Sequence, residues 1–208
     1  MGISAAQRAL YGHLQQVIPD HRVLQAFLQV KREQFVPRQF RGDAYEDHPL
    51  PIGHGQTISQ PTTALLMTSF LQVREGQKIL EIGTGSGYQA AILAEIIGPK
   101  GKIITVEFDK TLVTFARKNL QHYKQVQVIH GDGSLGYPKE APYDRIIVTA
   151  ACPTIPDHLL KQLKHDGILL APVGDLAVQT MTRMKKGQEP ESLGQFVFVP
   201  LQGKYGFS

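Results

Sequence analysis

The alternation of two kinds of segment constrains the fold of this chain most. Between residues 78 and 171, short apolar segments alternate with segments whose apolar residues recur at helical spacing. We expect strands over residues 78–82, 102–106, 126–129, 145–148 and 168–171, and helices over 88–97, 110–122 and 156–164, the last ending at Gly167. Such alternation predicts an α/β fold with a doubly wound, Rossmann-like, mostly parallel sheet that is covered by helices on both faces.

The two ends of the chain depart from this pattern. Residues 20–28 have helical spacing with Asp20 as the cap, residues 35–55 are irregular and rich in proline and glycine, and a helix is expected to begin near Pro61. Residues 179–184 and 195–199 are expected to form a C-terminal edge hairpin. We therefore expect one domain over residues 1–208, in which 1–75 form a helical extension on the substrate side.

A glycine-rich loop follows the first expected strand. It contains Gly83, Gly85, Ser86 and Gly87 in the order G-x-G-x-G. This spacing differs from the G-x-G-x-x-G of dinucleotide sites, and no G-x-x-x-x-G-K phosphate loop is present. Glycines allow positive φ angles and let a ligand approach the backbone closely, and the helix beyond the loop offers free N–H groups.

Three acidic residues lie at the carboxyl ends of successive expected strands, where doubly wound sheets bind ligands. Glu81 places a carboxylate at the loop mouth, which favours a cationic ligand over a dinucleotide. Glu107 can accept hydrogen bonds from ribose hydroxyls, and Asp132, next to Gly133, can accept one from the adenine amino group. Each acid alone is more often a solvent-facing cap or turn residue. Together with the loop they predict S-adenosyl-L-methionine as the cofactor.

Residues 51–61, PIGHGQTISQP, closely resemble a segment of the protein-L-isoaspartate O-methyltransferases. Further stretches agree with that family: FVP at 35–37, AY at 44–45, GDG at 131–133, TAA at 149–151 and FVPL at 198–201. The resemblance implies a carboxyl methyltransferase of protein repair, which moves a methyl group from S-adenosylmethionine to the α-carboxylate of L-isoaspartyl residues in damaged proteins and peptides. The sequence departs from the family pattern at Ser134, often an arginine, and at Asp175.

The resemblance also implies roles for individual residues. Ser59 corresponds to the active-site serine and contacts the substrate, and Val199 and Leu201 correspond to the wall of the substrate site. The implied cofactor-binding residues are Thr57, Ile58, Glu81, Gly83, Gly85, Ser86, Gly87, Glu107, Asp132 and Gly133. An α-carboxyl group has a pKa near 3.3–3.7 and is ionised at neutral pH, so the reaction needs no general base. We expect residues 35–56 and the C-terminal tail to act as a lid that excludes water.

Composition narrows the class of partner. The chain of 208 residues has a net charge of +4 and a pI near 9.1, but its basic residues are scattered, so we expect no nucleic-acid partner. We also expect no membrane partner, no metal site and a monomer. Residues 1–16 lack the apolar core of a signal peptide, and a single cysteine fits a reducing compartment, so we expect a cytoplasmic protein.

Two alternative functions remain compatible with the sequence. A methyltransferase of the same fold that acts on RNA, DNA or a small molecule would share the glycine loop. It would also predict a concentrated basic face or a base-amine motif. A non-catalytic cofactor-binding regulator would predict a degraded loop or a lost serine motif, and both are intact.

Overall fold

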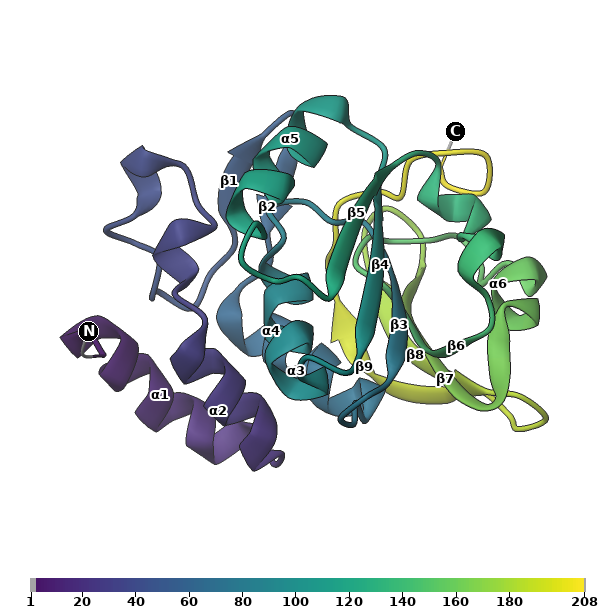
Figure 1. Ribbon diagram of the computed structural model, residues 1–208, viewed down its shortest axis with the longest axis horizontal. Helices are drawn as coiled ribbons and strands as arrows, with labels where there is room; N and C mark the ends of the chain where they lie inside the picture. The colour runs from purple at the N-terminus through teal and green to yellow at the C-terminus, as the bar shows by residue number, and fades with distance from the viewer. Residues whose placement is uncertain (1–2, 208) are drawn as a thin grey trace.

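A seven-stranded sheet forms the centre of the computed structural model, which describes residues 3–207 (Figure 1). Its strands run in the order β5-β4-β3-β6-β7-β8-β9. The first five of these are parallel, and β8 and β9 add an antiparallel hairpin at the edge. The bounds are β3 Lys78–Ile82, β4 Lys102–Glu107, β5 Val126–His130, β6 Tyr143–Val148, β7 Leu163–Gly174, β8 Gln179–Lys185 and β9 Glu191–Phe196. The predicted fold class is confirmed.

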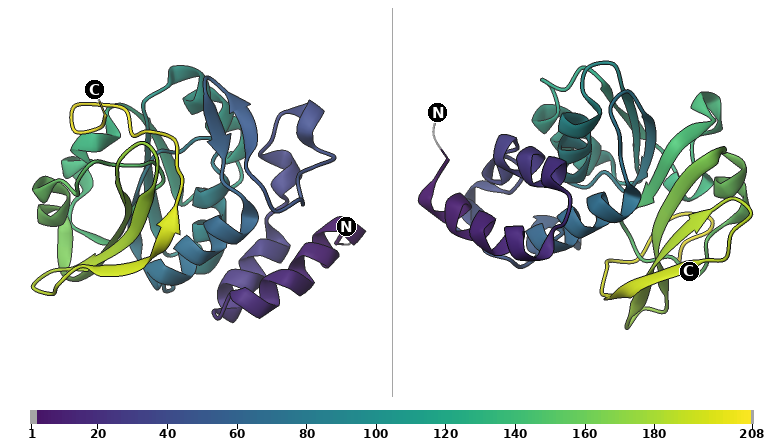
Figure 2. Two further views of the ribbon diagram at one scale, coloured as in Figure 1. Left: turned by 180° about the vertical axis from the view of Figure 1, so that it is seen from behind. Right: turned by 90° about the horizontal axis from the view of Figure 1, so that it is seen from below.

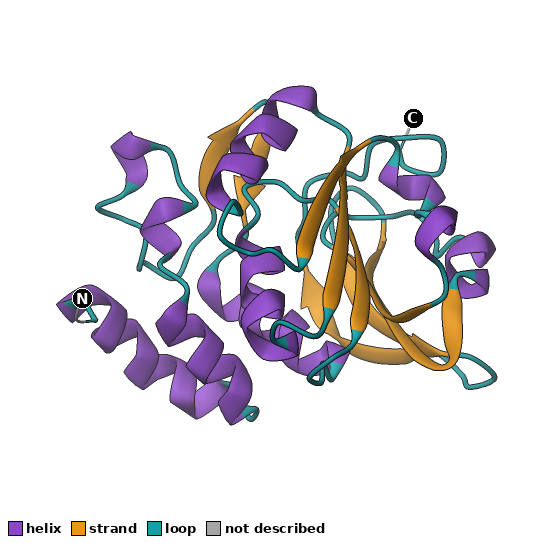
Figure 3. Cartoon of the chain, viewed as in Figure 1, coloured by secondary structure: helices purple, strands orange, loops and turns teal. Residues whose placement is uncertain are grey.

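Helices cover both faces of the sheet (Figure 3). One face carries α3 (Pro61–Leu71), α4 (Tyr88–Ile97) and α5 (Lys110–Asn119), and the other carries α6 (Asp157–Lys161) with short 3-10 turns. Because side chains alternate along a strand, Ile79 packs with α3 and α4 while Leu80 packs with α6. Both faces are thus apolar, as parallel strands require. In residues 3–207 no helix has both the length and the apolar content to cross a bilayer.

The strand order creates a crevice at one end of the sheet. From β3 the chain continues to β4 and β5 on one side, and β6 then pairs with the opposite edge of β3. Connections leaving β3 and β6 therefore diverge, and a crevice opens at their carboxyl ends. The backbone holds its rim together, because Gly83 N donates to Val106 O and Thr149 N donates to Ile82 O, both at 2.9 Å.

The N-terminal part packs on the outer side of the helical layer (Figure 2). Helices α1 (Ala5–Val17) and α2 (His21–Gln29) pair with each other, and α2 contacts α3 and α4. The predicted cap is confirmed, since the Asp20 side chain accepts a hydrogen bond from Arg22 N. The next segment contains 3-10 turns at Arg32–Gln34 and Arg38–Phe40 and an unexpected hairpin of β1 (Leu50–Gly53) and β2 (Gln56–Ile58).

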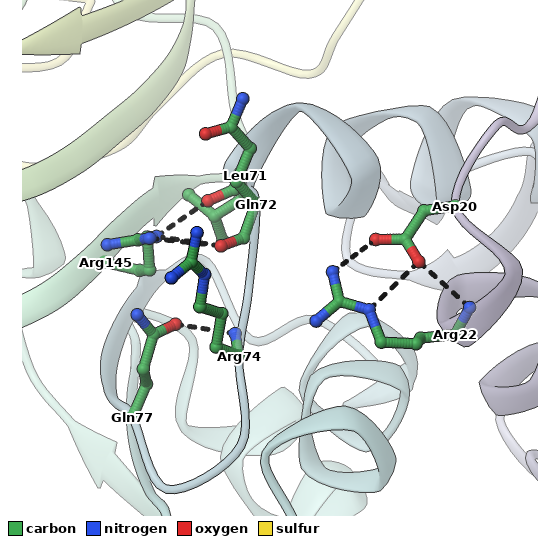
Figure 4. Close-up of polar contacts among 7 residues, drawn as sticks. All are labelled: Asp20, Arg22, Leu71, Gln72, Arg74, Gln77 and Arg145. Atoms are coloured by element: carbon green, nitrogen blue, oxygen red, sulfur yellow. Dashed lines mark hydrogen bonds and ion pairs between the residues drawn. The ribbon is translucent and has the colours of Figure 1, made fainter.

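A buried arginine closes the C-terminal end of α3 (Figure 4). Arg145 of β6 donates from Nε to Leu71 O at 2.8 Å and from Nη2 to Gln72 O at 3.1 Å. The last carbonyls of a helix have no intrahelical partner, so this guanidinium replaces the missing donors. Figure 4 also shows the Asp20–Arg22 cap at the start of α2 and the contact from Arg74 N to the Gln77 side chain.

Several predicted boundaries are wrong. The helix expected over 156–164 ends at Lys161, and Gly167 lies within β7 instead of ending a helix. The β6–β7 register shifts between Tyr143 and Arg145, and a Cβ at Gly167 would lie 3.1 Å from the Asp144 carbonyl oxygen. Glycine thus serves a close backbone approach there. Helix α5 ends at Asn119, before a turn, instead of at residue 122.

The second strand of the edge hairpin is displaced from its expected place. It covers Glu191–Phe196, so residues 197–199 leave the sheet. The Phe198 N–H donates to the Gln179 side chain, which replaces a ladder bond. The backbone of Val199 and Leu201 then bridges Ala151 with two 2.8 Å hydrogen bonds. The tail is thereby redirected to the crevice.

Candidate active site

A cavity that is partly open to solvent occupies the crevice at the carboxyl ends of β3 and β6. Its walls come from residues 54–59, from the glycine loop and α4, from the ends of β4 and β6, and from tail residues 199–202. All the predicted site residues line it except Glu81, Gly87 and Asp132. Segments separated by more than a hundred positions in the chain therefore meet at one site.

The glycine loop has the backbone conformation that its sequence predicts. Gly83, Gly85 and Gly87 have φ angles of 92°, 54° and 88°. A Cβ at Gly83 would lie 2.5 Å from Thr149 Oγ1, so the loop and the end of β6 need glycine to approach each other. Gly87 caps α4 and packs against Leu120, away from the cavity, so its contribution is the shape of the loop.

Glu107 presents a carboxylate to the cavity from the end of β4. Its Oε2 accepts a hydrogen bond from Gly85 N at 2.8 Å, and its Oε1 accepts one from Asp109 N at 2.9 Å. The side chain is thus held from both sides, and the residue is only 8% exposed. A carboxylate oxygen can accept more than one bond, so Glu107 keeps the capacity for ribose hydroxyls.

Glu81 does not lie at the mouth of the loop, and that expectation is corrected. Its side chain points into the interior beneath α3 and α4 and is fully buried, because alternation along β3 sends it to the helix-covered face. Burial raises its pKa to about 8, although a hydrogen bond from the Thr105 hydroxyl acts in the opposite direction. Its Oε1 has no hydrogen-bond partner.

Asp132 lies beside the cavity and binds the C-terminal tail. Its carboxylate accepts hydrogen bonds from Ser134 N, from Ser134 Oγ and from Lys204 N at 2.9, 2.6 and 2.9 Å. Ser134 Oγ in turn accepts a bond from Tyr205 N. Much of the hydrogen-bonding capacity that we assigned to adenine is therefore used by Ser134 and by the tail. Its neighbour Gly133 does line the cavity.

Ser59 lies between β2 and α3, on the cavity wall and half-buried. Its carbonyl accepts a 3.1 Å hydrogen bond from Arg32 Nη1. The first turn of α3 has fewer N–H groups available to a ligand than the sequence suggested. The Asp47 carboxylate accepts hydrogen bonds from Thr62 N at 2.9 Å and from Thr62 Oγ1 at 2.6 Å. An anion bound here would share that helix end with Asp47.

The β1–β2 hairpin lies next to α5 and over the glycine loop (Figure 1). At its tip, His54 has a φ of 54°, and its Nδ1 lies 3.0 Å from Asp109 Oδ2. The Ile52 side chain lies 3.4 Å from where a Cβ at Gly85 would be. Hydrogen bonds from Leu112 N and Thr111 N lower the pKa of Asp109, and the nearby His54 acts in the same direction. The hairpin therefore covers the glycine-loop side of the cavity.

Several residues of the cavity wall were missed by sequence reasoning. Phe108 and Asp109 follow Glu107, Thr149 and Ala150 follow β6, and Tyr88 and Gln89 begin α4. Their position at strand ends and at a helix start was a usable signal, since ligands of such sheets bind there. Phe108 is 49% exposed and offers an apolar ring on the wall.

The residues that line the cavity fit a nucleoside cofactor. Gly83 and Gly85 line the wall with backbone alone, Glu107 supplies the acceptors, and Phe108 supplies an apolar surface. Glu81 is not part of this fit, because it is fully buried and does not line the cavity.

Comparison with known proteins gives one consistent result. The sequence profile of the family described as protein-L-isoaspartate(D-aspartate) O-methyltransferase matches residues 7–206. A protein-L-isoaspartate O-methyltransferase of Methanosarcina mazei is 47% identical over 207 residues, covering 97% of this chain and 85% of that protein. One from Methanopyrus kandleri is 48% identical over 197 residues, covering 91% and 87%.

Solved structures agree with the sequence relatives. A protein-L-isoaspartate O-methyltransferase structure that is 28% identical superposes with a TM-score of 0.86, covering 96% of this chain and 67% of that one. A Plasmodium falciparum protein described as such a methyltransferase, solved with S-adenosyl-L-homocysteine, superposes with a TM-score of 0.83 at 25% identity, covering 94% and 98%.

Proposed function

This chain belongs to the protein-L-isoaspartate(D-aspartate) O-methyltransferase family and methylates L-isoaspartyl residues in protein repair, and we propose that the transfer takes place in the cavity at the ends of β3 and β6. S-adenosylmethionine is its cofactor. One observation carries the proposed location: Ser59 faces the same cavity as Gly83, Gly85 and Glu107. A substrate held by the serine would therefore reach a cofactor held by the glycine loop.

The cofactor side of the cavity is formed by the glycine loop and Glu107. Glu107 would hold the ribose hydroxyls, and Gly83 and Gly85 would let the cofactor lie against the backbone. We assign Thr57, Ile58, Ser86 and Gly133 to the same side, since they line the cavity. Glu81 lies beneath the loop and would act without touching the cofactor, and Asp132 would act through its hold on the tail.

The substrate side is formed by Ser59 and the tail. The Ser59 hydroxyl would donate to one oxygen of the isoaspartyl α-carboxylate, while Val199 and Leu201 form the opposite wall. When bound, S-adenosylmethionine supplies a methyl group on a positively charged sulfur. The carboxylate oxygen gains the methyl group as the sulfur–carbon bond breaks, and no proton has to move. The protein's task is alignment and exclusion of water.

Further parts of the proposal concern the whole chain. We assign residues 1–75 to the substrate side, since this stretch supplies Ser59. We also propose a monomeric, cytoplasmic enzyme whose macromolecular partners are isoaspartyl proteins and peptides rather than nucleic acids. The scattered basic residues and the single, buried cysteine support these assignments.

Methyl transfer to a matched pair of peptides tests the proposed function. One peptide carries L-isoaspartate, the other carries normal aspartate at the same position, and S-adenosylmethionine carries a labelled methyl group. We expect base-labile label on the isoaspartyl peptide alone. Absence of label on both peptides, with cofactor binding intact, would contradict the function and direct attention to nucleic-acid and small-molecule substrates.

A further inference from the structure

Arg32 is a fully buried arginine beside the substrate side of the cavity. Its guanidinium donates from Nε to Ala44 O at 2.9 Å, from Nη1 to Ser59 O at 3.1 Å and from Nη2 to His48 O at 3.3 Å. It also lies 5.5 Å from the ring centroid of Tyr88, which lines the cavity. Three separate points of the irregular segment between α2 and α3 therefore meet on one side chain.

Burying a guanidinium to hold a loop has a high cost in free energy. Removing a charge from water costs free energy unless hydrogen bonds and neighbouring charges compensate. Burial lowers the pKa of Arg32, and the nearby Tyr88 and Asp47 act in the opposite direction. An arginine nevertheless stays protonated, and its planar fork can meet several carbonyls at once. The geometry thus uses a property that lysine lacks.

The contact with Ser59 completes the restraint on that residue. On the N-terminal side, Ile58 pairs with Leu50 in the β1–β2 hairpin, which holds the peptide before Ser59. On the C-terminal side, Arg32 holds the Ser59 carbonyl, and Asp47 holds the start of α3 through Thr62. With both flanking peptides held, the remaining freedom of the serine is rotation about its side-chain bond.

We propose that Arg32 is a positioning residue for methyl transfer, which acts by holding the backbone of Ser59 so that its hydroxyl aligns the substrate carboxylate. This inference rests on the proposed role of Ser59. Without the hydrogen bond from Arg32 to the Ser59 carbonyl, the Ser59 hydroxyl would no longer be held in one position. Misplacement of a group by about 1 Å in such a site can lower the rate roughly 100-fold. The hydrogen bonds of Arg32 go to Ala44, Ser59 and His48 and not to Gly83, Gly85 or Glu107, so we expect the cofactor affinity to be kept.

Arg145 provides a matched control at the other end of the same helix. It too is buried and donates to carbonyl oxygens, those of Leu71, Gln72 and Asp144. None of these three residues lines the cavity. A purely structural role for Arg32 would make the two arginines behave alike, whereas a positioning role separates them.

The test compares Arg32→Lys with Arg145→Lys by melting temperature, by calorimetric Kd for S-adenosylhomocysteine, and by kcat on an isoaspartyl peptide. A lysine ammonium cannot reach all of the carbonyl oxygens that each arginine binds, so we expect both variants to lose stability. We expect kcat to fall about 10- to 100-fold in Arg32→Lys alone, at a temperature where both variants are folded, with the cofactor Kd changed by less than about threefold. Equal kcat values in the two variants would overturn the proposal.

A double-mutant cycle shows whether Arg32 acts through Ser59. In a Ser59→Ala background, Arg32→Lys should lower kcat by no more than about threefold further, because the group that it positions is gone. Additive losses would overturn the proposal. Full activity of Ser59→Ala itself would instead remove the assignment of Ser59, so the two failures are distinguishable.

A milder replacement keeps the test informative if Arg32→Lys does not fold. Arg32→Gln is smaller and retains an N–H donor, and saturating S-adenosylhomocysteine stabilises the folded state of each variant by mass action. The same cycle with Arg32→Gln should give the same non-additive loss. If neither variant folds with S-adenosylhomocysteine bound while Arg145→Lys does, Arg32 serves folding and the positioning role is wrong.

Discussion

The two sides of the cavity are built in different ways. The proposed cofactor side consists of short loops at the ends of neighbouring parallel strands, where backbone hydrogen bonds such as the one from Gly83 N to Val106 O hold each residue next to its strand. The substrate side joins Ser59 to tail residues far away in the sequence. It is held by side-chain hydrogen bonds, chiefly from the buried Arg32 and to the half-buried Asp47. One side is a property of the sheet, and the other is assembled by tertiary contacts.

This difference predicts separable effects. Changes on the cofactor side should alter cofactor affinity and leave the response to the peptide intact at saturating cofactor. Changes on the substrate side should lower turnover without lowering cofactor affinity. Any variant that moves both quantities together would weaken the distinction.

The largest effect on the cofactor side is expected for Gly83→Ala. The φ of 92° is strained for alanine, and the new Cβ would lie 2.5 Å from Thr149 Oγ1. Strain and a lost hydrogen bond together cost on the order of 2–4 kcal/mol, which corresponds to roughly 30- to 1,000-fold weaker binding of S-adenosylhomocysteine by calorimetry. Gly187→Ala is the control, since Gly187 has a φ of 74° in open space. Equal losses in both variants would contradict the prediction.

The next effect concerns pH and Glu81. Burial raises its pKa from 4.5 to about 8, so between these values the folded protein holds a proton that the unfolded chain has lost. The cofactor-free protein should therefore lose stability as pH rises through this window, by on the order of a few kcal/mol, and Glu81→Gln should remove that slope. Melting temperatures from pH 5 to 9 measure it, with the exposed Glu189→Gln as the control. A slope that persists in Glu81→Gln would show that another group is responsible.

A smaller effect is expected for Glu107→Gln. In the wild type the Glu107 carboxylate accepts hydrogen bonds from the backbone N–H groups of Gly85 and Asp109. The glutamine side chain has only one oxygen, so its NH₂ group would face one of these two N–H groups and that hydrogen bond would be lost. Loss of a hydrogen bond to a charged group costs about 1.5–3 kcal/mol, so the Kd of S-adenosylhomocysteine should rise roughly 10- to 100-fold. The KM for the isoaspartyl peptide at saturating cofactor should not change. Glu140→Gln, which removes a surface partner of Lys102, is the matched control.

The smallest effect is expected at the hairpin tip. His54→Asn keeps a residue that tolerates the φ of 54° but removes the contact with Asp109. Both side chains are partly exposed, and such pairs contribute up to about 1 kcal/mol, so S-adenosylhomocysteine should dissociate roughly two- to fivefold faster in stopped-flow measurements at low salt. High salt should reduce the difference between variant and wild type. A difference that is independent of salt would exclude the ion pair as its cause.

The same contrast explains what the sequence could predict. Gly83, Gly85 and Glu107 were predictable because a strand end, a glycine spacing and an acidic residue lie close together in the chain. The burial of Glu81 was missed because one residue's position on a strand does not reveal which helices cover it. Arg32 gave no signal in the sequence, since its partners at residues 44, 48 and 59 meet it only in the folded protein. The hairpin and the bulged start of β7 likewise depend on contacts distant in sequence.

The most direct test of the central claim is a paired measurement on Ser59→Ala. Calorimetry gives its Kd for S-adenosylhomocysteine, and methyl transfer to the isoaspartyl peptide gives its kcat. If the two sides are separable, the Kd stays within about threefold of wild type while kcat falls roughly 100-fold or more. A variant that turns over normally, or one that loses cofactor affinity in proportion to its loss of turnover, would contradict the division of the cavity into two independently built sides.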